Sequence, residues 1–492
     1  MKSTHPAGPI TIAVVGHTNV GKTSLLRTLT RRIDFGEVSA RSGTTRHVER
    51  VDLLVNGRAA VRFFDTPGLE DAVSLREHMG RFAAGESTPP DRIRAFLRSP
   101  EAHGNFEQEA KVLRALLDVD AAFLVVDARE PVLPKYRDEM ELVGSCARPV
   151  LPVLNFVRDP ASREGEWRAL LAAYGMHAVV RFDAAAPFVG AERDLYQDLV
   201  TLLRDRSAEL HEVVASLDDE AAQRRFGAAG RIAELLVDAS ATRRTIAAAD
   251  FTDPTRRAPL VDALRRTVSE KAQRCASDLL ALYGFRENDA GEAPLPMLEG
   301  RWSTDFFNPE AMKQVGLRLG QGAAVGAAFG AVADVALGGL SLGAGTAIGG
   351  TLGGALAQGW GPLGRRLVNR LREVHELGVE EQALVVMLAW QLDLVRALER
   401  RGHAATHRLH VDSKSPQPSA EMRVALGAVV RSLRPARAHP EWERGNQTRW
   451  RAASVDAPRA ALVETVAASV GVAARALLAS ADGETARTTI RP

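Results

Sequence analysis

The stretch that most constrains the fold is residues 10–26, ITIAVVGHTNVGKTSLL. Its first six residues are mostly β-branched, which predicts a buried strand ending at Val15, and a helix is expected from about Lys22. Between strand and helix lies a match to G-x-x-x-x-G-K-[ST], the phosphate-binding P-loop: Gly16, His17, Thr18, Asn19, Val20, Gly21, Lys22 and Thr23. Glycine allows the loop to turn its N–H groups toward phosphate oxygens, and the helix N-terminus adds partial positive charge. A Gly-rich turn that matches by chance is the alternative, and the combination of strand, loop and helix disfavours it.

A second motif follows at the end of a predicted hairpin. Residues 51–55 and 60–64 alternate in polarity and flank Asn56-Gly57, a strong hairpin turn signal. The second strand ends in Asp65, Thr66, Pro67 and Gly68. With Lys22 expected to reach the β- and γ-phosphates and Thr23 to ligate Mg²⁺, Asp65 can hold the hydration shell of the metal, and Gly68 can direct its N–H at the γ-phosphate. The two motifs together are far more specific than either alone.

The polar loop between the first helix and the hairpin contains Thr45, within Gly43-Thr44-Thr45-Arg46. We take Thr45 as the residue that closes on Mg²⁺ and the γ-phosphate. A surface turn rich in Ser, Thr and Gly is the open alternative.

The remaining N-terminal pattern alternates strands with helices. Buried strands are predicted at 121–126 and 149–155 and a weaker one at 178–182, with a helix over 107–117. Residues 72–110 are long, polar and interrupted by prolines, so we expect an enlarged switch or lid segment, or else a disordered insertion. The alternation predicts an α/β fold with a doubly wound, mostly parallel sheet.

Composition sets few further limits. With 492 residues the chain is too long for one core, and two or three domains are expected. A net charge of +2 creates no bulk field that demands nucleic acid. The two cysteines, Cys146 and Cys275, have no metal-ligand spacing and fit a reducing cytosol, and no secretory signal precedes the first strand.

The pattern GHTNVGKTS, GTTR and DTPG resembles the Era-like GTPases of the TrmE–Era–EngA–septin class over about the first 200 residues. The resemblance implies GTP/GDP as ligand and Mg²⁺ held through Thr23, Thr45 and Asp65. It implies that Lys22, Thr45 and Gly68 act in hydrolysis and that Asn19 is a ligand for K⁺. Leu69 stands where Ras-like GTPases have a catalytic Gln, so another group must order the attacking water. The nucleotide-binding residues carried over are Gly16, His17, Thr18, Asn19, Val20, Gly21, Lys22, Thr23, Ser24, Asp65, Thr66, Pro67, Gly68, Asn155 and Asp159.

The base-reading motif departs from the family. Where the family has N-K-x-D, this chain has Asn155-Phe156-Val157-Arg158-Asp159, so Phe156 replaces the Lys and the Asp is displaced by one residue. Asp159 reaches the guanine N1 and N2 donors only if the loop bulges, and Phe156 can offer a stacking face. Phosphate binding is therefore better supported than guanine selectivity.

The second half of the chain is rich in Ala, Leu, Arg and Glu with helical spacing. Helices are predicted over ELLVDASATRRTIAAA, over LVDALRRTVSEKAQRCASDLLALYGF, at 379–400 as a core helix containing Trp390, and from Pro458 to Ala479. We expect a GTPase domain over 1–205, a helical connecting region over 206–310, a glycine-rich hairpin with a basic and core helix over 311–402, and a C-terminal helical region with a polar tail over 403–492.

Residues 319–364 predict a helical hairpin. Glycines recur every fourth position in two runs, and arginines follow directly: Gly322, Gly326, Gly330, Gly345, Gly349 and Gly353, then Arg365, Arg366, Arg370 and Arg372. Small faces of this kind allow close helix approach, a frequent device in membranes, and the arginines suit anionic headgroups. A buried Gly/Ala hairpin of a soluble domain is the alternative.

In the order of its parts, the chain resembles a bacterial family whose C-terminal domain has no assigned function. The first hypothesis is a GTPase switch coupled to a helical domain that associates with a membrane or membrane protein through 319–364. The second is a degenerate GTPase that binds nucleotide and assembles partners without useful turnover. An RNA-associated assembly factor ranks last, because no convincing nucleic-acid surface follows residue 205. The predicted location is cytoplasmic, with a peripheral or integral position at the inner membrane as the variant, and a homodimer is left open.

Overall fold

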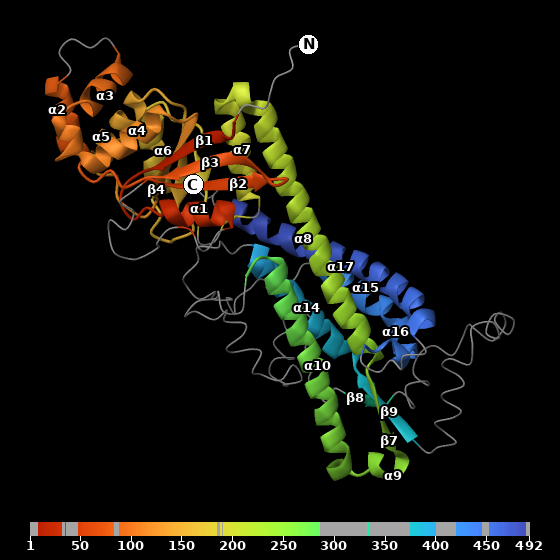
Figure 1. Cartoon of the computed structure of the whole chain (residues 1–492). Coiled ribbons are helices and arrows are strands. Elements are labelled where there is room, and N and C mark those ends of the chain that lie inside the picture. Colours follow the sequence, from red (N-terminus) through yellow and green to blue (C-terminus); the bar gives the residue numbers. More distant parts are fainter. Residues whose placement is uncertain are drawn as a thin grey trace, which may run out of the picture. The chain divides into compact units, whose positions relative to one another are not determined.

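The computed structural model describes residues 8–31, 35, 48–82, 88–184, 187–188, 190–285, 332–334, 374–399, 420–444 and 452–488 (Figure 1). The chain divides into two compact units, residues 1–222 with 400–406, and residues 223–399 with 407–492. Each unit has its own hydrophobic core and is described by itself.

A six-stranded sheet forms the centre of the first unit. Its strands are β1 (Ile10–Val15), β2 (Glu49–Val55), β3 (Arg58–Asp65), β4 (Ala121–Asp127), β5 (Val150–Asn155) and β6 (Val180–Arg181). They lie in the order β2-β3-β1-β4-β5-β6, and only β2 runs antiparallel to its neighbour. The predicted doubly wound, mostly parallel sheet is therefore confirmed, and so is the β2–β3 hairpin at Asn56-Gly57.

Helices cover both faces of this sheet (Figure 1). Successive residues of β1 point to opposite sides: Ile12 and Val14 pack with α1 (Lys22–Thr30) and α7 (Ala191–Leu202), whereas Ala13 and Val15 pack on the other side. Both faces of β1 must be apolar because both are buried. The second face is covered by α2 (Ala72–Phe82), α3 (Pro89–Leu97), α4 (Glu107–Leu117), α5 (Pro134–Ser145) and α6 (Glu164–Ala173), with a short 3₁₀ turn at Pro100–His103. A second 3₁₀ turn, Arg204–Arg206, follows α7.

Residues 72–110 are folded wherever the structure describes them. They form α2, α3, a 3₁₀ turn and the start of α4, and Leu75, Ile93 and Phe96 are fully buried. The alternative of a disordered insertion is therefore wrong for 72–82 and 88–110. The sequence contains a helix-start signal here, Thr88 followed by Pro89. In the structure Pro89 occupies the first position of α3, and the backbone N–H of Asp91 donates to Thr88 Oγ1.

The second unit is mostly helical. It contains the C-terminal part of α8 (Ser207–Ala241), then α9 (Ala248–Phe251), α10 (Pro254–Leu282), α14 (Glu381–Glu399), α15 (Ala420–Ser432), α16 (Arg434–Ala438), a 3₁₀ turn at Pro440–Trp442 and α17 (Ala452–Thr488). The predicted core helix at 379–400 corresponds to α14, and Trp390 is buried within it. A small antiparallel sheet, in the order β7-β9-β8, joins β7 (Arg243–Ala247), β8 (Val332–Asp334) and β9 (Val374–Val379).

Two helix predictions in this unit are wrong. The helix predicted over ELLVDASATRRTIAAA ends at Ala241, because the following residues form β7 and pair with β9. The β-branched pair Thr245 and Ile246 suits a strand, but the partner β9 lies more than 100 residues away in sequence and local periodicity cannot reveal it. Pro458 does not open a helix either, because α17 begins at Ala452 and contains Pro458 in its interior.

The predicted hairpin at 319–364 lies outside the described residues except for Val332–Asp334, which form β8 and not a helix. Within the described residues, one helical segment, Ala457–Leu478 of α17, has the length and hydropathy that a membrane-spanning helix needs. Core helices of soluble proteins share both properties, so this segment is weak evidence of membrane association.

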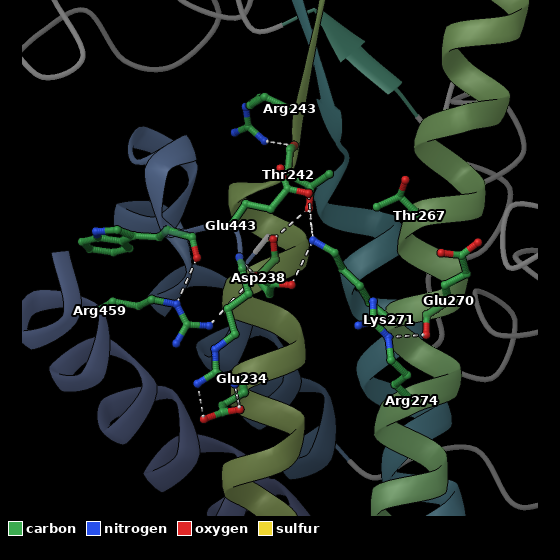
Figure 2. A network of polar contacts seen from close by, with 12 residues as sticks. Glu234, Asp238, Thr242, Arg243, Thr267, Glu270, Lys271, Arg274, Glu443 and Arg459 are labelled. Carbon is green, nitrogen blue, oxygen red and sulfur yellow. Dashed lines mark hydrogen bonds and ion pairs between the residues drawn. The ribbon is translucent and has the colours of Figure 1, made fainter. Parts of the chain in front are cut away.

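A buried network of charged side chains lies within the second unit (Figure 2). Lys271 of α10 donates to Asp238 of α8 at 2.9 Å, to Glu443 at 2.9 Å and to the Thr242 hydroxyl at 3.0 Å. The side chain of Lys271 is 7% exposed, and the backbone N–H of Arg444 adds a donor to Asp238. Opposite charges that are buried together must satisfy one another, so this network fixes how α8, α10 and the chain before α17 pack.

Candidate nucleotide-binding site

The P-loop connects β1 to α1 in the predicted place, and its glycines are required by the surrounding backbone. Gly16 has a φ of +142°, and a Cβ there would lie 2.3 Å from the carbonyl oxygen of Val125. Gly21 has a φ of +94°, and a Cβ there would lie 2.3 Å from Nδ2 of Asn155. Between them Asn19 is exposed and also adopts the left-handed conformation, with φ 64°. The loop therefore takes a backbone shape that requires glycine at both positions, 16 and 21.

Lys22 is folded across the loop from the first turn of α1. Its Nζ donates to the carbonyl oxygens of Gly16 at 3.1 Å and His17 at 2.8 Å. Burial lowers the pKa of Lys22 to about 8, while the carboxylates of Asp65, Glu139 and Glu70 act in the opposite direction. The ammonium is thus held against the loop carbonyls, where an anionic ligand would stabilise its charge.

Thr23 and Asp65 meet next to this lysine. The Thr23 hydroxyl donates to Oδ2 of Asp65 at 2.5 Å, and Asp65 is 1% exposed. Burial raises the pKa of Asp65 to about 6, against the hydrogen bond from Thr23 and the charge of Lys22. Among the described residues Oδ1 of Asp65 has no hydrogen-bond partner. A hydroxyl beside a buried carboxylate with a spare oxygen fits a hydrated Mg²⁺, which takes oxygen ligands and retains several waters.

The segment after β3 lies against the P-loop. The Thr66 hydroxyl donates to Val14 O at 2.8 Å, and Leu69 N donates to Gly16 O at 3.3 Å. A Cβ on Gly68 would lie 2.4 Å from the Thr18 hydroxyl, so only glycine permits this approach. The Leu69 side chain is fully buried in the core under α2–α6. It therefore cannot order a water beside a phosphate.

The altered base motif has a structural function that the sequence did not indicate. Nδ2 of Asn155 donates to Val20 O at 2.9 Å, and Oδ1 accepts from the backbone N–H groups of Phe156 and Ala184 at 3.0 and 2.9 Å. Asn155 thus ties the P-loop to the ends of β5 and β6. Oδ1 of Asp159 accepts from Ala161 N at 2.8 Å, which closes a turn in the loop after β5.

Phe156 takes the place of the motif lysine with a left-handed backbone, φ 59°. The Arg129 guanidinium lies 3.8 Å from the centre of its ring, and Asp127 binds the same guanidinium at 2.9 and 2.7 Å. Cation–π contact of this kind is favourable when the ring is partly desolvated. Asp127 and Arg129 were not predicted as site residues, although their position at and just after the end of the buried strand β4, beside β1, was a usable signal.

Thr45 lies outside the described residues. The other predicted site residues lie in three neighbouring places: the P-loop and α1 start (Gly16, His17, Thr18, Asn19, Val20, Gly21, Lys22, Thr23, Ser24), the end of β3 (Asp65, Thr66, Pro67, Gly68) and the end of β5 (Asn155, Asp159). Because β3, β1, β4 and β5 are successive parallel neighbours, these segments all follow carboxyl ends at one edge of the sheet. Such an edge is where ligands bind in open α/β sheets.

Comparison with known proteins agrees with this geometry. Residues 11–156 match the family described as 50S ribosome-binding GTPase, and residues 168–467 match the family described as Domain of unknown function (DUF3482). The chain is 32% identical over 187 residues to "Probable GTP-binding protein EngB" of Anaeromyxobacter sp. (strain Fw109-5), covering 37% of this chain and 74% of that protein. It is 32% identical over 130 residues to "tRNA modification GTPase MnmE" of Rhizobium johnstonii, covering 26% of this chain and 22% of that one.

Among solved structures, "Crystal structure of a probable GTP-binding protein engB" is similar at 18% identity and a TM-score of 0.26, over 40% of this chain and 99% of that chain. A score this low carries no argument about function, so the family assignment depends on the sequence matches and the site. From them it follows that the chain belongs to the TrmE–Era–EngA-type P-loop GTPases and continues into a DUF3482 domain.

Proposed function

We propose that this protein is a guanine-nucleotide switch that hydrolyses GTP slowly on its own. One observation carries the proposal: Lys22, the Thr23–Asp65 pair and Gly68 all lie at one P-loop whose glycines cannot be replaced, Lys22 on its carbonyls and Gly68 against Thr18. A cation, a metal-binding pair and a backbone donor at one place match the needs of a triphosphate.

Each group has a definable task in this proposal. Lys22 would neutralise charge on the β- and γ-phosphates, and Thr23 and Asp65 would hold Mg²⁺, which supplies further charge neutralisation when bound. The Gly68 N–H would face the terminal phosphate and report its loss after hydrolysis. Thr45 remains the proposed first-switch residue that closes on the metal.

Turnover is proposed to be slow because the position of the usual catalytic glutamine is buried. Leu69 contributes no polar group, and Glu70 is engaged by the Thr18 hydroxyl at 2.9 Å. A K⁺ ion near the exposed Asn19 would offset charge that develops in the transition state. The alternative is a nucleotide-binding assembly module without useful turnover.

Steady-state phosphate release separates these two functions. We expect the full-length protein to release phosphate from GTP with Mg²⁺, and to do so about tenfold faster or more in K⁺ than in Na⁺ at equal ionic strength, because a monovalent cation near Asn19 would stabilise the transition state. Release at the rate of the Lys22→Ala variant in both salts would support the assembly module. Equal turnover in both salts would remove K⁺ from the proposal.

Base selectivity should be modest and should depend on Asp159. We expect wild-type protein to prefer GTP over ATP, and Asp159→Ala to lower that preference about tenfold, because Asp159 is the carboxylate of the altered motif and a charged hydrogen bond contributes about 1.5–3 kcal/mol. Competition binding with both nucleotides measures the ratio. Asp205→Ala, in an exposed 3₁₀ turn of the same unit, is the matched control. A strong GTP preference that Asp159→Ala leaves intact would assign recognition to backbone groups.

The domain boundaries 1–205, 206–310, 311–402 and 403–492 remain proposals, and the hairpin at 319–364 remains a prediction from the sequence.

The partner of the switch is proposed only as a class of molecule, a membrane or a membrane protein. A membrane or membrane-protein partner would be supported if flotation with liposomes depended on residues 319–364. Protein that stays wholly soluble would instead favour a soluble helical domain.

A further inference from the structure

The side chain of His17 makes contacts that phosphate binding by the loop backbone does not require. Its Nδ1 lies 2.7 Å from Oε1 of Glu139 on α5 and 3.0 Å from the carbonyl oxygen of Leu69. Its Nε2 lies 2.9 Å from Nζ of Lys135, also on α5. The ring packs edge-on against Tyr136, with centroids 5.6 Å apart. One P-loop side chain therefore touches α5 and the segment after β3 at the same time.

These contacts define where the proton of the imidazole sits. The ammonium of a lysine can only donate, so Nε2 of His17 must accept from Lys135 and carries no proton. The single ring proton is then on Nδ1, where both neighbours, the Glu139 carboxylate and the Leu69 carbonyl, are acceptors. An imidazolium would instead place an N–H opposite the Lys135 ammonium. The hydrogen-bond partners therefore place a ring proton on Nδ1.

Glu139 and Lys135 hold this ring in place. Glu139 is 4% exposed, and burial raises its pKa, against the hydrogen bond that it accepts from His17 and the charges of Lys22 and Lys135. The edge contact of Tyr136 limits rotation of the ring, and Tyr136 itself packs on Trp167 with centroids 4.8 Å apart. A ring fixed on three sides is pre-organised to donate in one direction.

The Leu69 carbonyl, which shares the Nδ1 proton with the nearer Glu139 carboxylate, belongs to the segment proposed as the second switch. Both backbone groups of Leu69 are bonded to the P-loop, its N–H to Gly16 O at 3.3 Å and its C=O to His17. Residues 66–71 form no helix or strand, and these bonds hold them against the P-loop together with the Thr18–Glu70 contact at 2.9 Å and the bond from the Thr66 hydroxyl to Val14 O at 2.8 Å. Asp71 N also donates to Glu109 on α4 at 3.1 Å. Gly68 directly precedes Leu69, so its position depends on the same bonds.

We propose that His17 is a positioning residue, which holds the Leu69 carbonyl so that the Gly68 N–H faces the terminal phosphate of the bound nucleotide. The inference rests on the proposed function and adds a task to a P-loop side chain. It assigns to His17 part of the ordering that the buried Leu69 side chain cannot give.

The test compares two nucleotides that differ by the terminal phosphate. His17→Phe keeps the ring but removes the donor, and we expect its affinity for GDP to stay within about twofold of wild type. Its affinity for a non-hydrolysable GTP analogue should fall about tenfold, the effect of one hydrogen bond of about 1.4 kcal/mol, and its kcat should fall with it. His17→Asn places an amide N–H near the position of Nδ1 and should restore most of the lost affinity. Calorimetry on the full chain measures both ligands.

The possible outcomes distinguish a positioning role of His17 from a purely structural one. Equal losses for GDP and the analogue, with a lower unfolding temperature in both variants, would overturn the proposal in favour of a structural role. An unchanged ratio of the two affinities would overturn it as well. Wild-type protein that binds neither nucleotide would overturn the proposed function and this inference together, which distinguishes that failure from one confined to His17.

A second measurement observes the imidazole ring of the wild-type protein directly. In ¹⁵N-edited NMR of the GDP-bound wild-type protein, with His17 assigned by its absence in His17→Asn, we expect the neutral tautomer protonated on Nδ1. A ring protonated on Nε2 could not accept from Lys135 or donate to Leu69, so that signal would overturn the proposal.

Discussion

Replacing Lys22 with alanine should remove nucleotide binding. The lysine is folded over the P-loop and donates to two loop carbonyls, and its side chain is the fixed cation that α1 contributes there. Hydrogen bonds between charged groups contribute about 1.5–3 kcal/mol each, so losing contacts to two phosphates should cost about 3–6 kcal/mol. This corresponds to a loss of affinity between about 100-fold and 10,000-fold, for GTP and ATP alike. Calorimetric titration with each nucleotide in the presence of Mg²⁺ measures it.

The matched control is Lys111→Ala. Lys111 lies on α4 of the same unit and pairs with Glu107 at 2.9 Å one helical turn away. Surface pairs of this kind contribute about 0.3–0.5 kcal/mol, so nucleotide affinity should not change. Wild-type affinity in Lys22→Ala would show that the loop does not hold phosphates through its lysine, and the site would have to be assigned elsewhere.

Replacing Lys271 with methionine should destabilise the second unit more than any surface change. Methionine keeps the apolar stem, but it leaves Asp238 and Glu443 buried without the ammonium that both contact at 2.9 Å (Figure 2). Breaking a buried ion pair by removing one partner costs about 3–5 kcal/mol, because the remaining charge stays desolvated. Hydrogen exchange of amides in α8 and α10 reports this loss locally, so it does not require the whole chain to unfold in one step.

Two further variants make this result specific. Arg274→Met removes the same charge from an exposed position of α10 and should change stability by less than about 0.5 kcal/mol. Combining Lys271→Met with Glu443→Gln should recover part of the loss, because it removes one uncompensated charge. If Lys271→Met exchanged like Arg274→Met, the network would contribute nothing to stability and would have to be explained otherwise.

The sequence by itself determined the architecture of the first unit. The β-branched run before Gly16, the Asn56-Gly57 turn and the apolar stretches at β4 and β5 are local signals, and each strand formed where they indicated. Strands that alternate with helices have few permitted connections, so the doubly wound order followed from right-handed crossovers. The candidate phosphate-binding and metal-binding residues could be named for the same reason, because loop shape and ligand type are encoded within a few consecutive residues, and their roles stay predictions.

The tertiary structure alone decided what depends on partners distant in sequence. β7 is a strand because β9 pairs with it, although its own sequence continues a helical pattern. Asn155 was predicted as a nucleotide-binding residue, and only the structure shows that its amide connects Val20 and Ala184. The contacts of His17 with Leu69 and Glu139 span 52 and 122 residues. Local sequence patterns do not reveal which distant segments pair. The free energy of such a pairing arises only when folding brings the two segments together and removes water from between them.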